Sequence, residues 1–169
     1  MDFRNDIDNG ADNAQKIGGS KVEPMELIRL AIQARDFAYA PYSNYLCGAA
    51  LLAANGEVFL GCNVENAAYS PTNCGERTAF FKAISNGVRE FSTIAVMCGA
   101  RGTEAESFEY AFPCGVCRQV MLEFCDADTF KILTARSEAD YISRTLAELM
   151  PERWPTSPMF EAQDGRTLN

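Results

Sequence analysis

The sequence contains no histidine. Histidine is the usual partner of a nucleophilic Ser or Cys, and it is the most common general base near neutral pH. Its absence excludes Ser-His and Cys-His catalytic pairs from this chain. Any acid–base chemistry must therefore use carboxylates, Lys, Tyr or a metal-bound water.

An excess of positive charge is also missing. The chain has 15 Lys and Arg residues against 23 Asp and Glu residues, which gives a net charge of -8. This charge repels a polyanion unless the cations gather on one face, and the sequence has no Lys/Arg run that would form such a face. We therefore expect a small neutral substrate rather than DNA or RNA.

Long apolar runs are absent as well. None approaches the roughly 20 residues that a membrane-spanning helix needs. The first six residues, Met-Asp-Phe-Arg-Asn-Asp, lack the apolar stretch of a secretory signal. We expect a cytoplasmic protein with no membrane partner, in which the seven cysteines stay reduced and are available to bind zinc.

The length and composition predict one packed domain. At 169 residues with 47% apolar residues, the chain can bury roughly 70% of the surface that it exposes when unfolded. Residues 1–21 are rich in Asp, Asn and Gly, and we expect them to form a mobile acidic tail. The single domain should cover residues 22–155, and residues 156–169 should form a C-terminal tail.

Hydrophobic periodicity predicts an α/β fold. Helices are expected over residues 24–39, 74–86 and 114–124, and strands over 47–53, 57–63, 94–98 and 130–133. Asn55-Gly56 predicts a tight hairpin turn, Asn73 an N-cap and Gly87 a helix stop. Strands that alternate with helices indicate parallel pairing and right-handed connections. We expect a three-layer α/β/α domain whose mixed sheet has about five strands and an antiparallel edge hairpin.

Three cysteines and a glutamate form the most informative pattern. Cys74 and Glu76 lie in a Cys-Gly-Glu motif, and Cys114 and Cys117 follow 40 residues later in Pro-Cys-Gly-Val-Cys. Three thiolates fill three corners of a tetrahedral zinc site and leave the fourth for water, as in a catalytic site. A nearby carboxylate that does not bind the metal could then transfer protons, an arrangement known from nucleobase deaminases. We expect one Zn²⁺ per subunit, with Glu76 as the catalytic residue.

The charge of this site requires compensation. Three thiolates and one zinc ion sum to -1, and electron-rich sulfur opposes the ionisation of the bound water. The guanidinium of Arg77, the residue after Glu76, could donate hydrogen bonds to one or more of the ligand sulfurs and withdraw electron density from them. Both ligand groups also fall at predicted helix starts, where the free N–H groups stabilise thiolates.

Each residue also has a simpler interpretation when it is taken alone. A lone Cys-x-x-Cys is often a redox pair or half of a structural zinc site. Glu76 could be an ordinary first-turn helix acid, and Arg77 a surface charge. A closed structural site would need a fourth Cys or His ligand. The four remaining cysteines, which are expected to pack in the core, are Cys47, Cys62, Cys98 and Cys125.

Five blocks in order resemble the cytidine deaminases of the small, three-cysteine, homotetrameric type. The likeness covers about residues 24–154. The blocks read APYSNY at 40–45, GAAL at 48–51, GCNVENA at 61–67, CGERTA at 74–79 and PCGVCRQV at 113–120. The resemblance implies a homotetramer with its sites near subunit interfaces. It also implies zinc-dependent hydrolysis of cytidine and deoxycytidine to uridine and deoxyuridine for pyrimidine salvage.

The resemblance also implies roles for residues that bind substrate. Asn63 and Glu65 would hold ribose hydroxyls, although either could simply close a loop. Tyr45, where the family usually has Phe, would lie near the pyrimidine, and main-chain groups of Gly75 would face the base. Trp154 would reach a neighbouring subunit's site or serve only as an anchor.

Two further positions bear on the comparison. Tyr69 resembles a family residue at the subunit contact. Phe112 replaces a small Ser whose backbone helps to read the amino group, so the shape of the pocket is expected to differ here.

Two alternative functions remain at this point. One is deamination of another cytosine nucleoside such as blasticidin S, whose deaminases share the three-cysteine core. The other is a noncatalytic zinc-stabilised binding protein, which would not need Glu76. Deaminases of nucleic acids or of deoxycytidylate usually present His as the first zinc ligand, so they fit this chain less well.

Overall fold

One mixed sheet organises the computed structural model, which describes residues 14–16, 22–103 and 108–153. The strand order among these residues is β1-β3-β2-β4-β5-β6. β4 pairs with β5 in parallel, and the other neighbouring strands are antiparallel. The strands are β1 (Ala14–Lys16), β2 (Tyr45–Ala53), β3 (Glu57–Cys62), β4 (Phe91–Ala100), β5 (Lys131–Ala135) and β6 (Tyr141–Thr145).

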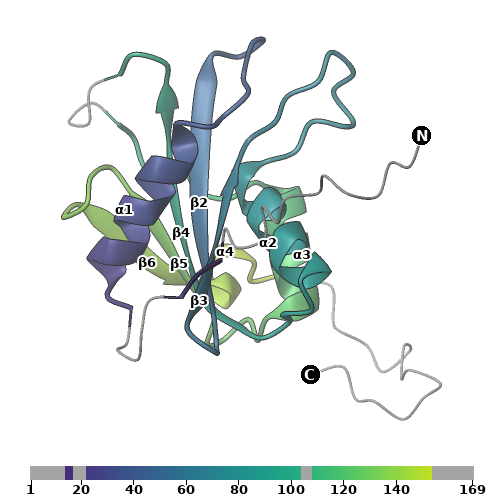
Figure 1. The fold of residues 1–169 in the computed structure, drawn as a ribbon. Coiled ribbons are helices and arrows are strands. Elements are labelled where there is room, and N and C mark those ends of the chain that lie inside the picture. Colours follow the sequence, from purple (N-terminus) through teal and green to yellow (C-terminus); the bar gives the residue numbers. More distant parts are fainter. Residues whose placement is uncertain (1–13, 17–21, 104–107, 154–169) are drawn as a thin grey trace, which may run out of the picture.

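Helices cover both faces of this sheet. α1 (Pro24–Arg35) packs on one face, and α2 (Gly75–Ser85) and α3 (Gly115–Phe124) lie on the other, as Figure 1 shows. A single turn, α4 (Leu146–Leu149), follows β6. The three-layer α/β/α class predicted from the sequence is therefore confirmed. In the described part of the chain, no helix is long and apolar enough to cross a membrane.

The hairpin forms as predicted, but it is not at the edge of the sheet. Asn55-Gly56 joins β2 to β3, with Gly56 at φ +86° and the Asn55 side chain accepting a hydrogen bond from the Glu57 N–H. β1 pairs with the outer side of β3. It lies within the segment expected to be a tail, where no hydrophobic period marks a strand. β6 was also missed, since its partly exposed residues give no clean alternation.

Fewer of the described strands pair in parallel than the sequence predicted. β3 and β4, which α2 connects, are both antiparallel to β2 and lie on either side of it. They therefore run in the same direction without pairing. The connection through α3 joins direct neighbours, β4 and β5.

Two of the predicted helix ends need correction. α2 has Cys74 rather than Asn73 as its N-cap, while the Asn73 side chain donates to the Thr78 hydroxyl. α1 ends at Arg35 rather than at about residue 39. Gly87, at φ +85°, provides the predicted left-handed stop after α2. These differences are small in sequence, but the first places a ligand sulfur at the start of a helix.

The structure joins Cys47 and Cys98 in a disulfide, whereas the sequence suggested two separate core thiols. The two residues face each other in the register of β2 and β4. Facing Cβ atoms on antiparallel strands lie about 4.5–5.5 Å apart, close to the separation that a disulfide needs. Periodicity alone does not reveal the register, so this pair could not be predicted.

A glycine in β3 lets α2 approach the sheet closely. A Cβ on Gly61 would lie under 3.0 Å from the Gly75 carbonyl oxygen and the Ala79 nitrogen. Both of these are backbone atoms, which cannot rotate away. The position of the first turn of α2, which carries Glu76, therefore depends on the missing side chain at residue 61.

We expect Gly61→Ala to lower the free energy of unfolding by at least about 1–3 kcal/mol, because overpacking against backbone forces α2 outward. Urea denaturation followed by circular dichroism measures this change. Gly115→Ala is the matched control, since a Cβ there would have no heavy atom within 4 Å. Equal midpoints for the two variants would contradict the prediction.

Candidate active site

The three predicted cysteine ligands come together at the starts of two helices. Cys74 is the N-cap of α2, Cys114 is the N-cap of α3, and Cys117 lies in the first turn of α3. The Sγ atoms of Cys74 and Cys114 are 3.9 Å apart, and those of Cys114 and Cys117 are 3.4 Å apart. All three lie within 4.8 Å of one another. A tetrahedral zinc with bonds of about 2.3 Å would hold sulfurs about 3.8 Å apart, so the group fits zinc.

Exposure differs among the three sulfurs. Cys117 is fully buried, Cys74 is half-buried and Cys114 is exposed. The group that could hold a metal contains these three cysteines within the residues described here. One side of the cluster therefore stays open to solvent, as a catalytic zinc site requires.

Without metal, Cys74 and Cys117 have pKa values that are shifted in opposite directions. A hydrogen bond from Cys117 lowers the pKa of Cys74 to about 5, and hydrogen bonds from Arg77 and Cys114 act in the same direction. The same bond to Cys74, together with burial and the charge of Glu76, raises the pKa of Cys117 far above that of a free thiol. At neutral pH the metal-free chain therefore holds a thiolate at Cys74 beside a protonated thiol at Cys117. Zinc binding must displace that proton.

Arg77 lies behind the cluster. Its NH2 group donates to the Cys74 sulfur at 3.7 Å and to the Thr72 carbonyl at 3.0 Å. Its buried Nε has no hydrogen-bond partner within the described residues. The guanidinium is therefore placed where it can withdraw electron density from one ligand sulfur.

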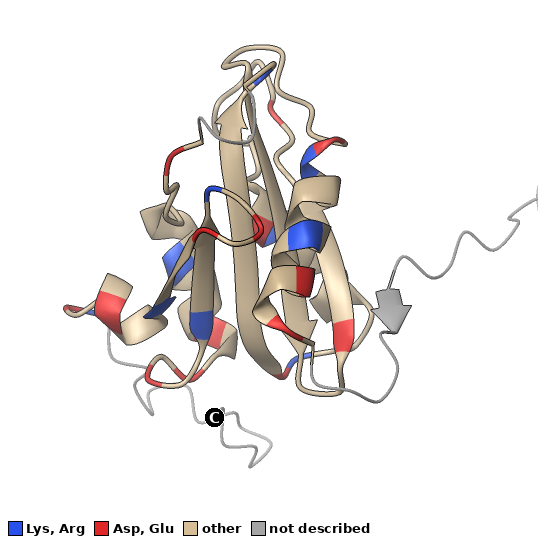
Figure 2. Cartoon of the chain, turned by 90° about the vertical axis from the view of Figure 1, so that its left-hand side faces the viewer, with Lys and Arg blue, Asp and Glu red and all other residues tan. Residues whose placement is uncertain are grey.

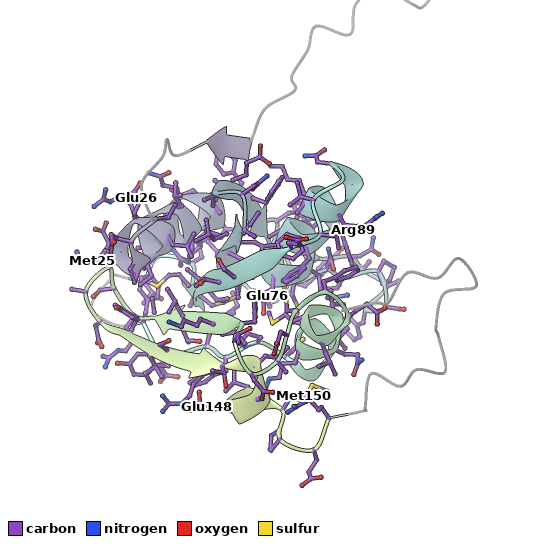
Figure 3. All side chains as sticks on the ribbon, turned by 90° about the horizontal axis from the view of Figure 1, so that it is seen from below. Met25, Glu26, Glu76, Arg89, Glu148 and Met150 are labelled. Carbon is purple, nitrogen blue, oxygen red and sulfur yellow. A yellow bond between two sulfur atoms is a disulfide. The ribbon has the colours of Figure 1, made fainter. Side chains whose placement is uncertain are left out.

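Glu76 is buried beside the sulfurs, with 5% of its surface exposed. Burial is the main reason that its pKa is raised, and the negative charge of Cys74 raises it further. Figure 3 shows Glu76 near the middle of the molecule, whereas Glu26 and Glu148 lie at the periphery. A buried carboxyl with a raised pKa holds a proton to a higher pH than a free carboxyl does, which suits a group that takes up and passes on protons.

The raised pKa gives a prediction for the metal-free protein. The folded chain holds the Glu76 proton above pH 4.3, the approximate pKa of an unfolded glutamate. This contribution to stability is present at low pH and is lost as pH rises through the folded pKa. Glu76→Gln cannot titrate, so its stability relative to wild type should increase as pH rises from about 4.3 through the folded pKa of Glu76. Urea midpoints across that range measure the difference, and a difference that does not change with pH would contradict it.

The two residues expected to bind ribose, Asn63 and Glu65, both follow the end of β3. The buried side chain of Asn63 accepts from the Cys47 N–H at 2.8 Å and donates to the Tyr45 carbonyl at 2.9 Å. Glu65 accepts from the Tyr42 and Ser43 N–H groups and from the Ser43 hydroxyl, and these bonds lower its pKa. Asn63 therefore holds the start of β2, and Glu65 holds the residues just before it.

The backbone connects these residues to the metal site. Val64 and Asn73 exchange two hydrogen bonds, each 2.9 Å long, so the chain after β3 lies beside the residue that precedes Cys74. Gly75 packs against β2 and β3. A Cβ at this position would lie 3.3 Å from the Cys47 carbonyl oxygen. Tyr45 is 40% exposed at the start of β2. Trp154 lies outside the described residues.

One residue near the cluster was missed by the sequence analysis. Arg118, directly after Cys117, donates to the carbonyl oxygens of Pro113 and Leu149. Its position beside a ligand was the available signal. The partner at Leu149 could not be inferred, since α4 has only four residues and was not predicted.

The open three-sulfur cluster beside a buried carboxyl, on a three-layer α/β/α fold, defines a zinc-dependent enzyme of the hydrolase class. Residues 22–133 match the family model "Cytidine and deoxycytidylate deaminase zinc-binding region". The chain belongs to this family.

Similar proteins agree with this assignment. A cytidine deaminase of Sporosarcina psychrophila is 48% identical over 126 residues, which cover 75% of this chain and 87% of the relative. The crystal structure of the Burkholderia pseudomallei cytidine deaminase superposes with a TM-score of 0.70 at 41% identity, covering 79% of this chain and all of the other. The Mycobacterium tuberculosis cytidine deaminase structure gives a TM-score of 0.65 at 34% identity, covering 79% and 98%.

Proposed function

We propose that this protein catalyses the hydrolytic deamination of cytidine and deoxycytidine to uridine and deoxyuridine, with release of ammonia. The observation that carries the proposal is the cluster of Cys74, Cys114 and Cys117, open on one side, with the buried Glu76 beside it. The similar proteins described above carry the name cytidine deaminase, which supports cytosine nucleosides as the substrate class.

The cysteines and Glu76 have separate tasks in this mechanism. The three thiolates would hold one Zn²⁺, which acts as a Lewis acid and makes a water reactive near neutral pH. Glu76 takes a proton from the attacking water and delivers it to N3 of the cytosine ring as the oxygen adds to C4. It then takes the remaining proton from the oxygen added to C4 and delivers it to the amino group. The C4–N bond breaks, ammonia leaves, and the oxygen stays on C4 as the carbonyl of uracil. Burial raises the pKa of Glu76, which makes its carboxylate a stronger base than a free one.

Other residues of this chain support those transfers. Arg77 offsets the charge of the ligand sulfurs through its contact with Cys74. Asn63 and Glu65 are proposed to hold ribose hydroxyls with the lone pairs and the N–H that their backbone contacts leave available. Tyr45 would border the pyrimidine, Gly75 would present its backbone to the base, and Trp154 would reach a neighbouring site.

A substrate panel tests the proposal directly. Purified protein is incubated with cytidine, deoxycytidine, their monophosphates and blasticidin S, and both ammonia release and loss of cytosine absorbance are measured. Turnover of the two nucleosides is expected. Turnover of blasticidin S alone would move the specificity to that nucleoside, and binding of cytidine without any turnover would indicate a noncatalytic protein.

A neutral nucleoside also agrees with the distribution of charge. Figure 2 shows acidic and basic positions interspersed along the ribbon on the side of the molecule that faces the viewer. The net charge of -8 opposes binding to a nucleic acid. We place the reaction in pyrimidine salvage, in the cytoplasm.

We further propose a homotetramer with its sites near subunit interfaces. Large apolar side chains are exposed on the segments next to the site: Phe37 is 80% exposed and Tyr69 is 88% exposed. Surfaces of this kind often mark interfaces. The other members of this group are Tyr39, Tyr42 and Val64. Sedimentation equilibrium of the zinc-loaded protein should give four times the chain mass, and a monomer mass would contradict the proposal.

A further inference from the structure

Arg118 connects the metal site to the C-terminal part of the fold. Its Nε donates to the Pro113 carbonyl at 2.8 Å, and its NH1 donates to the Leu149 carbonyl at 2.7 Å. Both bonds are partly buried, and the second joins residues 31 positions apart. One planar guanidinium thus joins the residue before Cys114 to the last residue of α4. Two short bonds from one rigid group fix the relative position of the two segments.

The Pro113 end of this connection bears on a metal ligand. Proline has no N–H, so its carbonyl is the one backbone group of Pro113 that can form a hydrogen bond. Cys114 follows it directly and is the exposed member of the sulfur cluster. The segment that leads to Cys114 is held at its other end by a second arginine, because Arg136 Nε donates to the Phe108 carbonyl, also at 2.8 Å.

The Leu149 end is anchored firmly. Thr145 and Glu148 form a reciprocal capping box at the start of α4. The N–H groups of Leu146 and Ala147 donate to carbonyls of the segment between α3 and β5, and Leu146 is fully buried. The Leu149 carbonyl, at the end of a helix, has no partner further along that helix. Arg118 supplies that partner and so ties the residue before Cys114 to an anchored turn.

We propose that Arg118 is a positioning residue for the metal site, which holds Cys114 in place through Pro113 by bracing it against α4. This inference depends on the proposed zinc site but not on the identity of the nucleoside. Loss of the brace should let Cys114 move away from the other two sulfurs. Metal release should then become faster, and the geometry around the metal should change.

The test compares three variants of the full-length, metal-loaded protein: Arg118→Gln, Arg118→Lys and Arg136→Gln. Zinc release to a chromogenic chelator, the visible spectrum of the Co²⁺-substituted protein, and kcat and KM for cytidine are measured. Arg136→Gln is the matched control, since it removes an equally short bond to a carbonyl at the far end of the same segment.

Arg118→Gln should release zinc about 10- to 100-fold faster, which is the usual effect of removing a group that orients a ligand. Its Co²⁺ spectrum should shift and its kcat should fall, while KM changes by less than about threefold because no substrate contact is lost. Arg118→Lys should be intermediate, since an ammonium lacks the fork that reaches both carbonyls. Arg136→Gln should match wild type in zinc release and in the Co²⁺ spectrum.

Wild-type zinc release and an unchanged Co²⁺ spectrum in Arg118→Gln would overturn the inference. Equal acceleration in Arg136→Gln would also overturn it, because general loosening of the segment would then explain the effect. If Arg118→Gln does not fold, the comparison of Arg118→Lys with Arg136→Gln decides in the same way. A third outcome separates this inference from the proposed reaction. If the wild type does not turn over cytidine but Arg118→Gln still releases zinc faster than the wild type, the positioning role of Arg118 stands and the proposed reaction is rejected.

Discussion

Replacing Glu76 by glutamine is expected to lower kcat for cytidine by about 10²–10⁴, the usual contribution of general acid–base catalysis. The amide has nearly the same shape as the carboxyl and fits the same buried space, so the fold should be retained. It cannot carry a proton from water to the ring and then to the amino group. Zinc content should stay at one per chain, because Glu76 is not one of the three sulfur ligands. Steady-state kinetics and elemental analysis measure the two quantities.

Glu26→Gln is the matched control for this prediction. Glu26 is also an acid in the first turn of a helix, but its side chain lies on the surface and pairs with Arg29 at 2.8 Å. An exposed ion pair of this kind contributes little to stability. The control should therefore keep wild-type kcat and KM. Near-normal turnover in Glu76→Gln would remove the catalytic assignment, whereas loss of zinc would show that the carboxyl supports the metal instead.

Replacing Cys117 by alanine is expected to abolish zinc binding and to lower activity by at least about 10³-fold. Cys117 is the most buried ligand, and its thiol also donates to Cys74. A structural zinc site has four protein ligands and a catalytic site has three, but this variant keeps only two sulfurs. Without the metal, the water keeps its ordinary pKa and is not reactive near neutral pH. Metal analysis after gel filtration, together with the deamination assay, measures both losses.

Cys125→Ala separates metal loss from the general cost of removing a partly buried thiol. Burial raises the pKa of Cys125 to about 12, so this thiol stays protonated, and it lies outside the sulfur cluster. The control should keep zinc and activity, with only the loss of stability expected for a small cavity. Chelation of zinc from the wild type should reproduce the Cys117→Ala activity, and re-addition of zinc should restore it. Activity that survives complete chelation would reject the metal mechanism.

The sequence predicted those parts of the fold that repeat with a clear period. α1 shows its buried leucines and alanines at helical spacing, and Asn55-Gly56 identifies the hairpin. The three cysteines of the cluster could also be predicted from the sequence, because both groups of cysteines coincide with predicted helix starts. Spacing along the chain is enough for Cys114 and Cys117, which lie within one helical turn.

Features that depend on strand register or on partners far away in the sequence could not be predicted from the sequence. The Cys47–Cys98 disulfide follows from how β2 is aligned with β4. The side chain of Asn63 was expected to face substrate, yet it also closes the backbone of the neighbouring strand. The Leu149 partner of Arg118 lies 31 residues away on an element too short to produce a period.

The unequal exposure of the three sulfurs determines the route of metal exchange. Cys117 faces the interior and shares a proton with Cys74, whereas Cys114 faces solvent. An incoming ion, or a competing chelator, therefore meets the Cys114 side of the cluster before it reaches the buried pair. The rate at which newly made chains bind their metal, and the rate at which they lose it to a chelator, should then both depend on how often the Cys114 side chain moves away from the cluster.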